Sequence, residues 1–269
     1  MSNSRKPENI IEYKKWLKEK HNILIDKRLS THYETVTTLV KNDLGSSDFW
    51  LQLINNLKES HDEYLIKSNG YLLFLESAES INILIKPFDS LLDKSFRKNI
   101  LNNKDFDNPP SSGWIFPTNW LTRINDIIRT TIVVKYLDGV EFTLEKLKSF
   151  LEQNCNKKCK IDLEAREEGY YAAHINFKHM FEVLSIDFDT EFVEMSIEIQ
   201  ITTQLQELIK RFLHKYYEKK RLRKKTNEKT KWQWNYRSNE FATNYMGHIL
   251  HYIEGMIMDI RERIKEEEI

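Results

Sequence analysis

The stretch VEMSIEIQIT, residues 193–202, alternates apolar and polar side chains without a break. A period of two residues is the geometry of a β-strand, because successive side chains point to opposite faces of a sheet. The apolar face holds Val193, Met195, Ile197, Ile199 and Ile201, and the polar face holds Glu194, Ser196, Glu198 and Gln200. An ordinary strand with one solvent-exposed face has the same pattern, so the alternation alone predicts a strand and no function.

Upstream of this strand, four short segments read as further strands of the same sheet. The β-branched run TTIVVKYL at 130–137 predicts a buried strand, and the others are 159–166, 169–179 and 181–188, the last of which is expected to pair with 193–202. A helix over 142–154, with Thr143 as its N-cap, separates the first two. Strands and helices interleaved in this way predict an α+β fold, with a mixed central sheet of about five strands flanked by helices.

Helical periodicity dominates both ends of the chain. We expect helices over 8–28 and 31–60, a mainly helical stretch over 61–103, and a turn-rich break at PPSSGW, residues 109–114. Thr118 is expected to cap a short segment that ends at Asp126. Two more helices are predicted over 204–221 and 242–266.

Composition excludes several classes of protein. The 269 residues include 41 Lys+Arg and 41 Asp+Glu, and 40% are hydrophobic, which excludes a disordered chain. Two Cys make a poor zinc site and no disulfide scaffold, so we interpret them as reduced thiols. The polar start and the lack of an 18-residue apolar run predict a cytoplasmic protein with no membrane contact.

The neutral total hides one basic segment. Residues 207–231 hold eleven Lys/Arg and three Glu, a net charge of +8. Six of these cations lie close together: Lys219, Lys220, Arg221, Arg223, Lys224 and Lys225. Such a segment indicates a polyanionic partner, RNA above all, although a solvated helix face has the same composition.

Two carboxylates are candidates for a metal site. Asp126 comes just before the strand at 130–137, and Glu198 lies on the polar face of 193–202. Mg²⁺ prefers one or two carboxylates together with substrate phosphates, and cations must then surround the polyphosphate. The candidate cations are Lys86, Lys94, Arg97 and Arg129, each of which could equally be a solvated surface residue.

Four motifs, in this order along the chain, carry a resemblance. They are IKPFDSLLDKSFRKN (85–99), in which Lys86, Ser90 and Lys94 are evenly spaced, INDIIRTTIVV (124–134), EEGYYAAH (167–174) and IEIQITT (197–203). Together they resemble the RelA/SpoT-type pyrophosphokinase, or alarmone synthetase, which has a nucleotidyltransferase-like fold. The resemblance covers roughly residues 80–235, and it implies a helical region at 1–79 and a C-terminal helix at 236–269 that packs on the synthetase domain.

The resemblance implies a reaction and a role for each site residue. ATP binds with Mg²⁺, and its β,γ-pyrophosphate moves to a 3′-hydroxyl group. Asp126 and Glu198 would hold the metal and act in catalysis, and Lys86, Lys94, Arg97 and Arg129 would bind ATP. Tyr170, His174 and Gln200 would bind the acceptor, with the Tyr170 ring stacked on a base. Tyr171 would face the other way or pack against the protein.

The sequence departs from the family pattern at several acceptor positions. Leu84 replaces the arginine that opens the basic motif, Arg129 replaces a glycine, Tyr171-Ala172 replaces Arg-Ser, and Thr202 replaces an arginine. These departures resemble the toxic branch of small synthetases, which implies the 3′ end of tRNA as acceptor and a neutralising antitoxin as partner. Two alternatives stay open: a (p)ppGpp or (p)ppApp synthetase that acts on a free nucleotide such as a guanosine nucleotide, and a catalytically inactive RNA-binding module.

Overall fold

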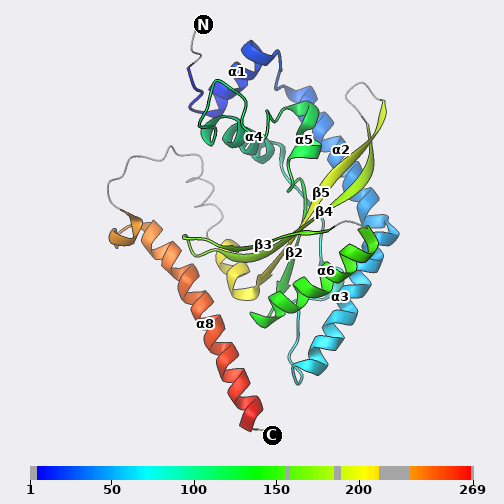
Figure 1. The fold of residues 1–269 in the computed structure, drawn as a ribbon, viewed down its shortest axis with the longest axis vertical. Coiled ribbons are helices and arrows are strands. Elements are labelled where there is room, and N and C mark those ends of the chain that lie inside the picture. Colours follow the sequence, from blue (N-terminus) through cyan, green and yellow to red (C-terminus); the bar gives the residue numbers. More distant parts are fainter. Residues whose placement is uncertain (1–4, 156–157, 185–188, 212–230, 268–269) are drawn as a thin grey trace. The chain divides into compact units, whose positions relative to one another are not determined.

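The computed structural model describes residues 5–155, 158–184, 189–211 and 231–267. Five strands form one mixed sheet flanked by helices, in the order β1-β2-β5-β4-β3 (Figure 1). The strands are β1 (Leu84–Ile85), β2 (Ile128–Val134), β3 (Lys160–Ala165), β4 (Tyr171–Leu184) and β5 (Thr190–Thr203). The predicted α+β fold with about five strands is therefore confirmed.

Two antiparallel pairings position residues of the candidate site. Strand β1 pairs with β2, with Leu84 opposite Arg129, and β3 pairs with β4, from Lys160 opposite Asn176 to Ala165 opposite Tyr171. The sequence predicted two strands where β4 is one. The reason is that the alternation continues through the middle of β4, with Met180 exposed and Phe181 buried. The two-residue strand β1 was not predicted.

The chain divides into two compact units. The first comprises Met1–Ser46, Ile83–Arg129 and Lys178–Ile197, and the second comprises Ser47–Asn82, Thr130–Phe177 and Glu198–Ile269. The long strands run from one set of residues into the other, so both units contribute to the sheet.

The first unit contains α1 (Ile10–His21), α2 (Lys27–Ser46), α4 (Phe88–Phe96), which continues into the π-helical turn η2 (Arg97–Leu101), and α5 (Trp120–Arg123). A buried polar network ties α1 to α4: the Tyr13 hydroxyl lies 2.8 Å from the Ser95 hydroxyl and accepts a 2.8 Å hydrogen bond from Asn99. Burial raises the pKa of Tyr13 to about 12, so this hydroxyl stays neutral.

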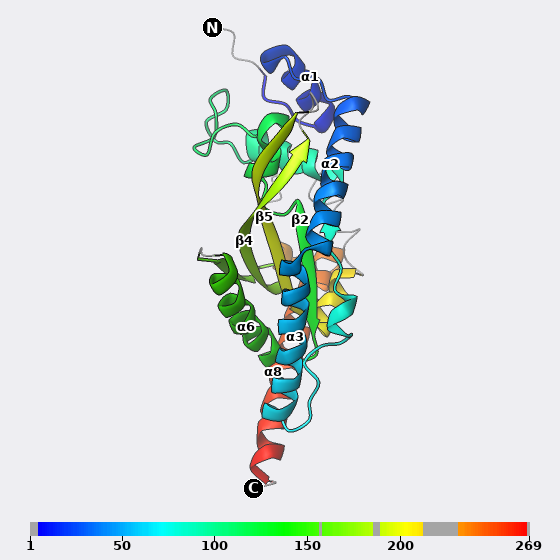
Figure 2. The same ribbon diagram turned by 90° about the vertical axis from the view of Figure 1, so that its right-hand side faces the viewer.

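The second unit contains α3 (Asp48–Lys67), α6 (Asp138–Cys155) and α8 (Asn239–Glu267), and residues 204–211 are helical as well. Helices α3 and α6 lie side by side (Figures 1 and 2), with the rings of Tyr64 and Phe142 centred 5.3 Å apart. The predicted final helix at 242–266 is confirmed as α8. No helix among the described residues is long and apolar enough to cross a membrane.

Several predicted helix boundaries are wrong, each for a local reason. The predicted helix 8–28 ends at His21, because the backbone of Asn22 is left-handed (φ 54°). The predicted helix 31–60 is interrupted at Ser47, whose side chain caps the N-terminus of α3 by accepting a hydrogen bond from the Trp50 amide. The stretch 61–103 is α-helical only to Lys67 and again from Phe88, with one 3₁₀ turn, η1 (Ala78–Ser80), between them.

Two predicted N-caps are also wrong. Thr143 is buried inside α6, which begins five residues earlier at Asp138. Thr118 lies within the 3₁₀ turn η3 (Pro117–Asn119), and the residue that precedes this turn is Phe116.

Candidate active site

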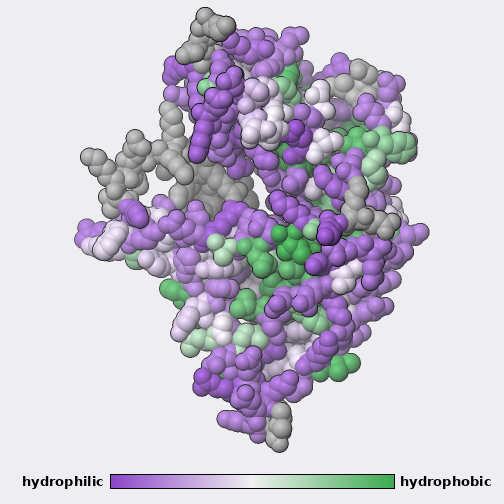
Figure 3. Space-filling model, viewed as in Figure 1, coloured by the Kyte–Doolittle hydropathy of each residue, from purple (hydrophilic) through white to green (hydrophobic). Residues whose placement is uncertain are grey.

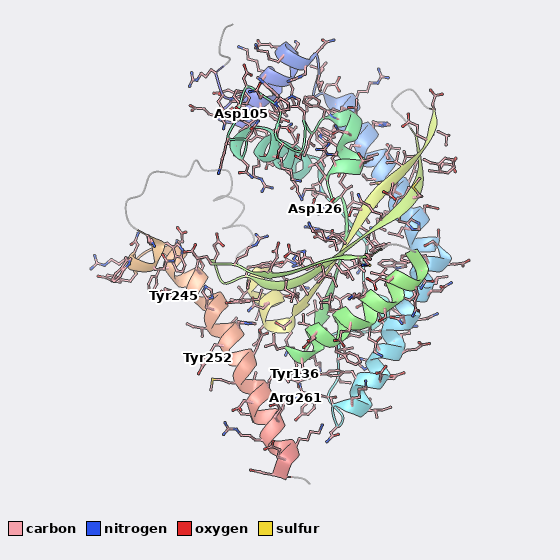
Figure 4. All side chains as sticks on the ribbon, viewed as in Figure 1. Asp105, Asp126, Tyr136, Tyr245, Tyr252 and Arg261 are labelled. Carbon is pink, nitrogen blue, oxygen red and sulfur yellow. The ribbon has the colours of Figure 1, made fainter. Side chains whose placement is uncertain are left out.

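In the first unit, Asp126 lies between two lysines. Its Oδ2 accepts a 3.0 Å hydrogen bond from Lys86 Nζ, and its Oδ1 lies 2.8 Å from Lys94 Nζ (Figure 4 labels Asp126). Asp126 precedes β2, Lys86 directly follows β1, and Lys94 lies on α4. The pairing of β1 with β2 brings the first two together, because the Lys86 amide donates to the Ile127 carbonyl at 2.9 Å.

The three side chains of this cluster are largely shielded from water. The exposed fractions are 10% for Lys86, 16% for Asp126 and 22% for Lys94. Burial alone would raise the pKa of Asp126, but the charges and hydrogen bonds of Lys94 and Lys86 outweigh it and hold the pKa at about 2. Burial lowers the pKa of Lys86, against the attraction of Asp126. Asp126 is therefore ionised at neutral pH, and the cluster has one positive charge more than negative if both lysines are charged.

More cations surround this cluster. Arg129 is close enough to help lower the pKa of Lys86, and the pKa of Lys98 is lowered by burial and then by Lys94, with a smaller effect of Arg97. The structure thus brings Lys86 and Lys94 to Asp126 and places Arg129 near Lys86. Sequence reasoning missed Tyr33, whose hydroxyl donates to the Lys86 carbonyl at 2.7 Å and so fixes the backbone at that lysine. No pattern around Tyr33 in the sequence points to this contact.

In the second unit, His174 lies between two carboxylates. Its Nδ1 is 3.5 Å from Glu198 Oε1 on β5, and its Nε2 is 3.7 Å from Glu164 Oε2 on β3. All three side chains are less than a fifth exposed, at 13%, 18% and 19% for His174, Glu198 and Glu164. Sequence reasoning missed Glu164. The β3–β4 register supplies it, since Asp162 faces His174 and Glu164 lies two residues further along the same side.

Tyr170 joins this group from the loop between β3 and β4. Its hydroxyl lies 3.4 Å from His174 Nε2 and accepts a hydrogen bond from the Gln200 side chain, whose oxygen in turn accepts from Lys210 Nζ at 3.0 Å. Burial, and then the charge of Glu164, raises the pKa of Tyr170, so the hydroxyl stays protonated. The structure thus brings together Tyr170, His174 and Gln200, the three residues that the sequence proposed for the acceptor. Gln200 is buried, so the polar face of this strand is not an ordinary solvent face.

The loop that carries Tyr170 is a tight turn with one obligatory glycine. The Gly169 amide donates to the Arg166 carbonyl at 2.9 Å, and the Arg166 amide donates to the Tyr170 carbonyl at 3.0 Å. Gly169 has φ +78°, a left-handed backbone conformation that residues other than glycine rarely adopt. The turn places the Arg166 guanidinium 5.3 Å from the centre of the Tyr170 ring, a contact that sequence reasoning missed.

Helix α8 holds the other side of this loop. Tyr171 stacks on His251 with ring centres 3.7 Å apart, and its hydroxyl lies 2.8 Å from His248 Nδ1. His248 Nε2 is 2.9 Å from the Glu167 carbonyl. Gly247 and Gly169 touch backbone to backbone: a Cβ on Gly247 would lie 2.1 Å from the Gly169 oxygen. Tyr171 thus packs against α8, while the contacts of Tyr170 are with His174, Gln200 and Arg166.

The donor chemistry of these residues fits a magnesium ion that arrives with its substrate. Among the described residues, no group of three or more His, Cys, Asp or Glu side chains could hold a metal ion. Mg²⁺ in phosphoryl transfer needs only one or two protein carboxylates, because substrate phosphates and water complete its shell. Asp126 in the first unit and Glu198 in the second are oxygen donors of this kind. The six cations of the basic segment, Lys219, Lys220, Arg221, Arg223, Lys224 and Lys225, lie outside the described residues.

Comparison with solved structures shows the fold. The small alarmone synthetase 1 from Bacillus subtilis, bound to its product pppGpp, has a TM-score of 0.50 and 16% identity, over 89% of this chain and 97% of that one. The small alarmone synthetase 2 from the same organism has a TM-score of 0.49 and 17% identity, over 83% and 98%. The chain has the fold of the first of these proteins.

A third structure, a GTP pyrophosphokinase family protein from Streptococcus pneumoniae, has a TM-score of 0.47 and 13% identity, over 96% of both chains. No protein-family model matches the sequence, and no curated relative matches it either.

Proposed function

We propose that the chain is an ATP-dependent pyrophosphokinase of the RelA/SpoT type, which moves the β,γ-pyrophosphate of ATP to a 3′-hydroxyl group. The observation that carries this proposal is the cluster of Asp126 with Lys86 and Lys94, since all three come from motifs that the sequence assigned to the phosphate donor. The fold shared with a synthetase that was crystallised with its product pppGpp supports the same reaction class.

The transfer forms one phosphorus–oxygen bond and breaks another. The acceptor's 3′-oxygen attacks the β-phosphorus of ATP, the bond from that phosphorus to the oxygen bridging to the α-phosphate breaks, and AMP leaves. The hydroxyl proton goes to Glu198, which acts as general base. His174, 3.5 Å from Glu198, orients this carboxylate.

The cations of the first unit neutralise the donor. Lys86 and Lys94, with Arg97 and Arg129, bind the triphosphate of ATP, whose negative charge grows on the departing AMP oxygen during transfer. Asp126 and Glu198 are the residues that would hold Mg²⁺, and the ion when bound would spread the charge of the polyphosphate.

The second unit binds the acceptor. One face of the Tyr170 ring lies toward Arg166, and we assign the opposite face to the acceptor's terminal base. Gln200 and His174 fix the hydroxyl of Tyr170 and therefore the plane of its ring. This rigidity supports stacking, because a ring that is already held loses little conformational freedom when a base binds.

We further propose that the acceptor is the 3′ end of a tRNA, as in a toxin that inhibits translation and is neutralised by an antitoxin protein. Two observations support this choice over a free guanosine nucleotide. Tyr171, where the family has an arginine, is stacked on His251 and directed to α8. The segment 207–231 has a net charge of +8, which suits a long phosphate backbone better than a single nucleotide.

Label transfer from ATP marked at its γ-phosphate tests both parts of the proposal. Incubation with tRNA should move label to the RNA, and incubation with GDP, GTP or ATP as acceptor should not. Label on a nucleotide alone would make the chain a (p)ppGpp or (p)ppApp synthetase, the second candidate, which the product-bound relative favours. Label on neither the RNA nor a nucleotide would contradict the proposed pyrophosphokinase activity and favour a catalytically inactive RNA-binding module.

Substitutions in the basic segment, residues 207–231, test whether it binds RNA. In a variant with Gln at Lys219, Lys220, Arg221, Arg223, Lys224 and Lys225, transfer to tRNA should fall while ATP affinity holds. Each phosphate group that the variant no longer binds should reduce the log–log salt slope of RNA binding by about 0.7–0.9. An unchanged affinity and slope would remove the segment from the RNA-binding surface.

A further inference from the structure

Lys210, on the helical stretch 204–211, is held more closely than an ordinary surface lysine. Hydrophilic residues cover most of the face that Figure 3 shows, so a charged side chain needs a specific contact to mark it as functional. The side chain of Lys210 is 28% exposed, whereas that of its neighbour Arg211 is 72% exposed. The Lys210 ammonium group lies 3.0 Å from Gln200 Oε1 and 3.2 Å from Glu207 Oε2. These two oxygens hold Lys210 beside the residues that we assign to the acceptor.

The ammonium group of Lys210 fixes the orientation of the Gln200 amide, because a lysine ammonium donates hydrogen bonds and accepts none. The Gln200 oxygen therefore faces Lys210, and its NH₂ group faces the other way and donates to the Tyr170 hydroxyl. If the amide were turned over, two donors would face each other at Lys210. Lys210 thus determines that the Tyr170 oxygen accepts a hydrogen bond from Gln200.

The Tyr170 hydroxyl carries this direction on to His174. Burial raises the pKa of Tyr170, so the hydroxyl keeps its proton. Since the oxygen accepts from Gln200, the proton is available to His174 Nε2, which lies 3.4 Å away. A ring nitrogen that accepts a hydrogen bond carries no proton, so the neutral ring has its proton on Nδ1. Nδ1 is the nitrogen that lies 3.5 Å from Glu198 Oε1.

We propose that Lys210 is a positioning residue that sets the tautomer of His174 and so directs an N–H group at Glu198. An N–H group on Nδ1 attracts one oxygen of the Glu198 carboxylate and leaves the other for the acceptor's 3′-hydroxyl group. A lone pair on Nδ1 would repel the same carboxylate. The role of Glu198 as general base rests on the proposed function, whereas the direction of the hydrogen bonds is a property of the chain alone.

One nearby carboxylate favours the other tautomer. Glu164 Oε2 lies 3.7 Å from His174 Nε2 and would attract a proton to that nitrogen, although Arg166, 2.7 Å from Glu164, offsets its charge. Without Lys210, the glutamine amide is free to turn over and take the Tyr170 proton. A proton on Nε2 would then have the Tyr170 oxygen and Glu164 as acceptors. Removal of Lys210 is therefore expected to move the ring proton from Nδ1 to Nε2.

NMR of the ring nitrogens tests the tautomer on the full chain, without any substrate. A long-range ¹H–¹⁵N correlation spectrum of protein labelled with ¹⁵N-histidine shows which nitrogen holds the proton, and a His174→Gln variant assigns the signal among the eight histidines. At about pH 8, above the ordinary pKa of histidine, the wild type should have the proton on Nδ1. Lys210→Met should move it to Nε2, whereas Lys210→Arg, which also only donates, should keep it on Nδ1.

Two further variants control this measurement. Gln200→Glu has two acceptor oxygens, so it takes the tyrosine proton even beside Lys210 and should also move the ring proton to Nε2. Arg211→Met is the matched control, because Arg211 bonds the same Glu207 at 3.0 Å, and it should leave the proton on Nδ1. A wild-type proton on Nε2 would overturn the proposal, and so would one that stays on Nδ1 in Lys210→Met. Should that variant not fold, the same result in Gln200→Glu would overturn it.

Label-transfer kinetics separate positioning from phosphate binding. As a positioning residue, Lys210 acts on the chemical step, so Lys210→Met should lower kcat at least tenfold at saturating acceptor, and Lys210→Arg should keep most of it. A higher KM with an unchanged kcat would make Lys210 a phosphate-binding residue and overturn its role in positioning. The expected tautomers in a chain without transfer activity would contradict the proposed function and still support the direction of the hydrogen bonds.

Discussion

The pKa values of Asp126 and Lys86 both fall, but for opposite reasons, because the two groups have different numbers of oppositely charged partners. Asp126 interacts with two ammonium groups, so opposite charge outweighs burial and its pKa falls to about 2. Lys86 shares that one carboxylate with Lys94 and feels the repulsion of Lys94 and Arg129, so burial prevails and its pKa falls too. A polyphosphate that binds here relieves the repulsion among the cations.

The proposed metal residues give the sharpest test at this scale. Asp126→Asn and Glu198→Gln should each reduce pyrophosphate transfer by at least a hundredfold, because each removes a charge that the proposed metal requires. Asp89→Asn is the control, since Asp89 is an exposed carboxylate on α4 in the same unit as Asp126. Label transfer measures the activity, and circular dichroism checks the fold. Activity within a few-fold of wild type in either variant would rule out the assignment.

Substitutions at Tyr170 and Tyr171 should have different effects, the first on acceptor affinity and the second on stability. Tyr170→Ala should weaken acceptor affinity about 5- to 150-fold, the equivalent of a missing base stack worth about 1–3 kcal/mol, while ATP binding holds. Tyr170→Phe keeps the ring and should lose much less. Tyr171→Ala should instead lower the melting temperature, because it removes the stack on His251. If Tyr171→Ala harms acceptor binding more than Tyr170→Ala, the two roles are assigned the wrong way round.

At the scale of elements, the contact between α8 and the 166–170 loop depends on Gly247. Gly247→Ala should destabilise the protein and raise the KM for the acceptor, because the new Cβ would lie 2.1 Å from a backbone oxygen. Gly255→Ala is a control on the same helix, since no atom lies within 4 Å of its Cβ. That control should stabilise by about 0.5–1 kcal/mol through helix propensity. Urea unfolding and acceptor kinetics measure both effects, and equal stability of the two variants would refute the argument.

Sequence pattern located long regular elements well and local breaks poorly. The strand around Glu198 and the helix α8 follow from periodicity over ten or more residues. The helix end at Asn22 and the two-residue strand β1 depend on single backbone conformations and on pairing with β2, which no periodicity reveals. Among the residues of the two side-chain clusters, those that lie within the four motifs were named from the sequence. Glu164, Arg166 and Tyr33 come to the site through strand register or tertiary packing, and they were missed.

At the scale of the molecule, acid should weaken the fold partly through Asp126. Its pKa is about 2 when folded against 3.8 ordinarily, so its ionisation stabilises the folded state above about pH 4. This contribution, about 2 kcal/mol, is lost as the pH falls from 4 toward 2. The difference in unfolding free energy between wild type and Asp126→Asn should therefore shrink over this range. A difference that is constant from pH 5 to pH 2.5 would show that the ion pairs do not hold this pKa down.

The backbone contact between Gly169 and Gly247 also limits how this protein can evolve. When two side chains touch, an enlargement of one can be compensated by a reduction of the other. Here no such compensation exists, because neither partner has a side chain to reduce. A lineage that replaced either glycine would have to move the helix or the turn before it recovered function. The two positions are therefore expected to stay glycine together, or to change only when the whole junction is rebuilt.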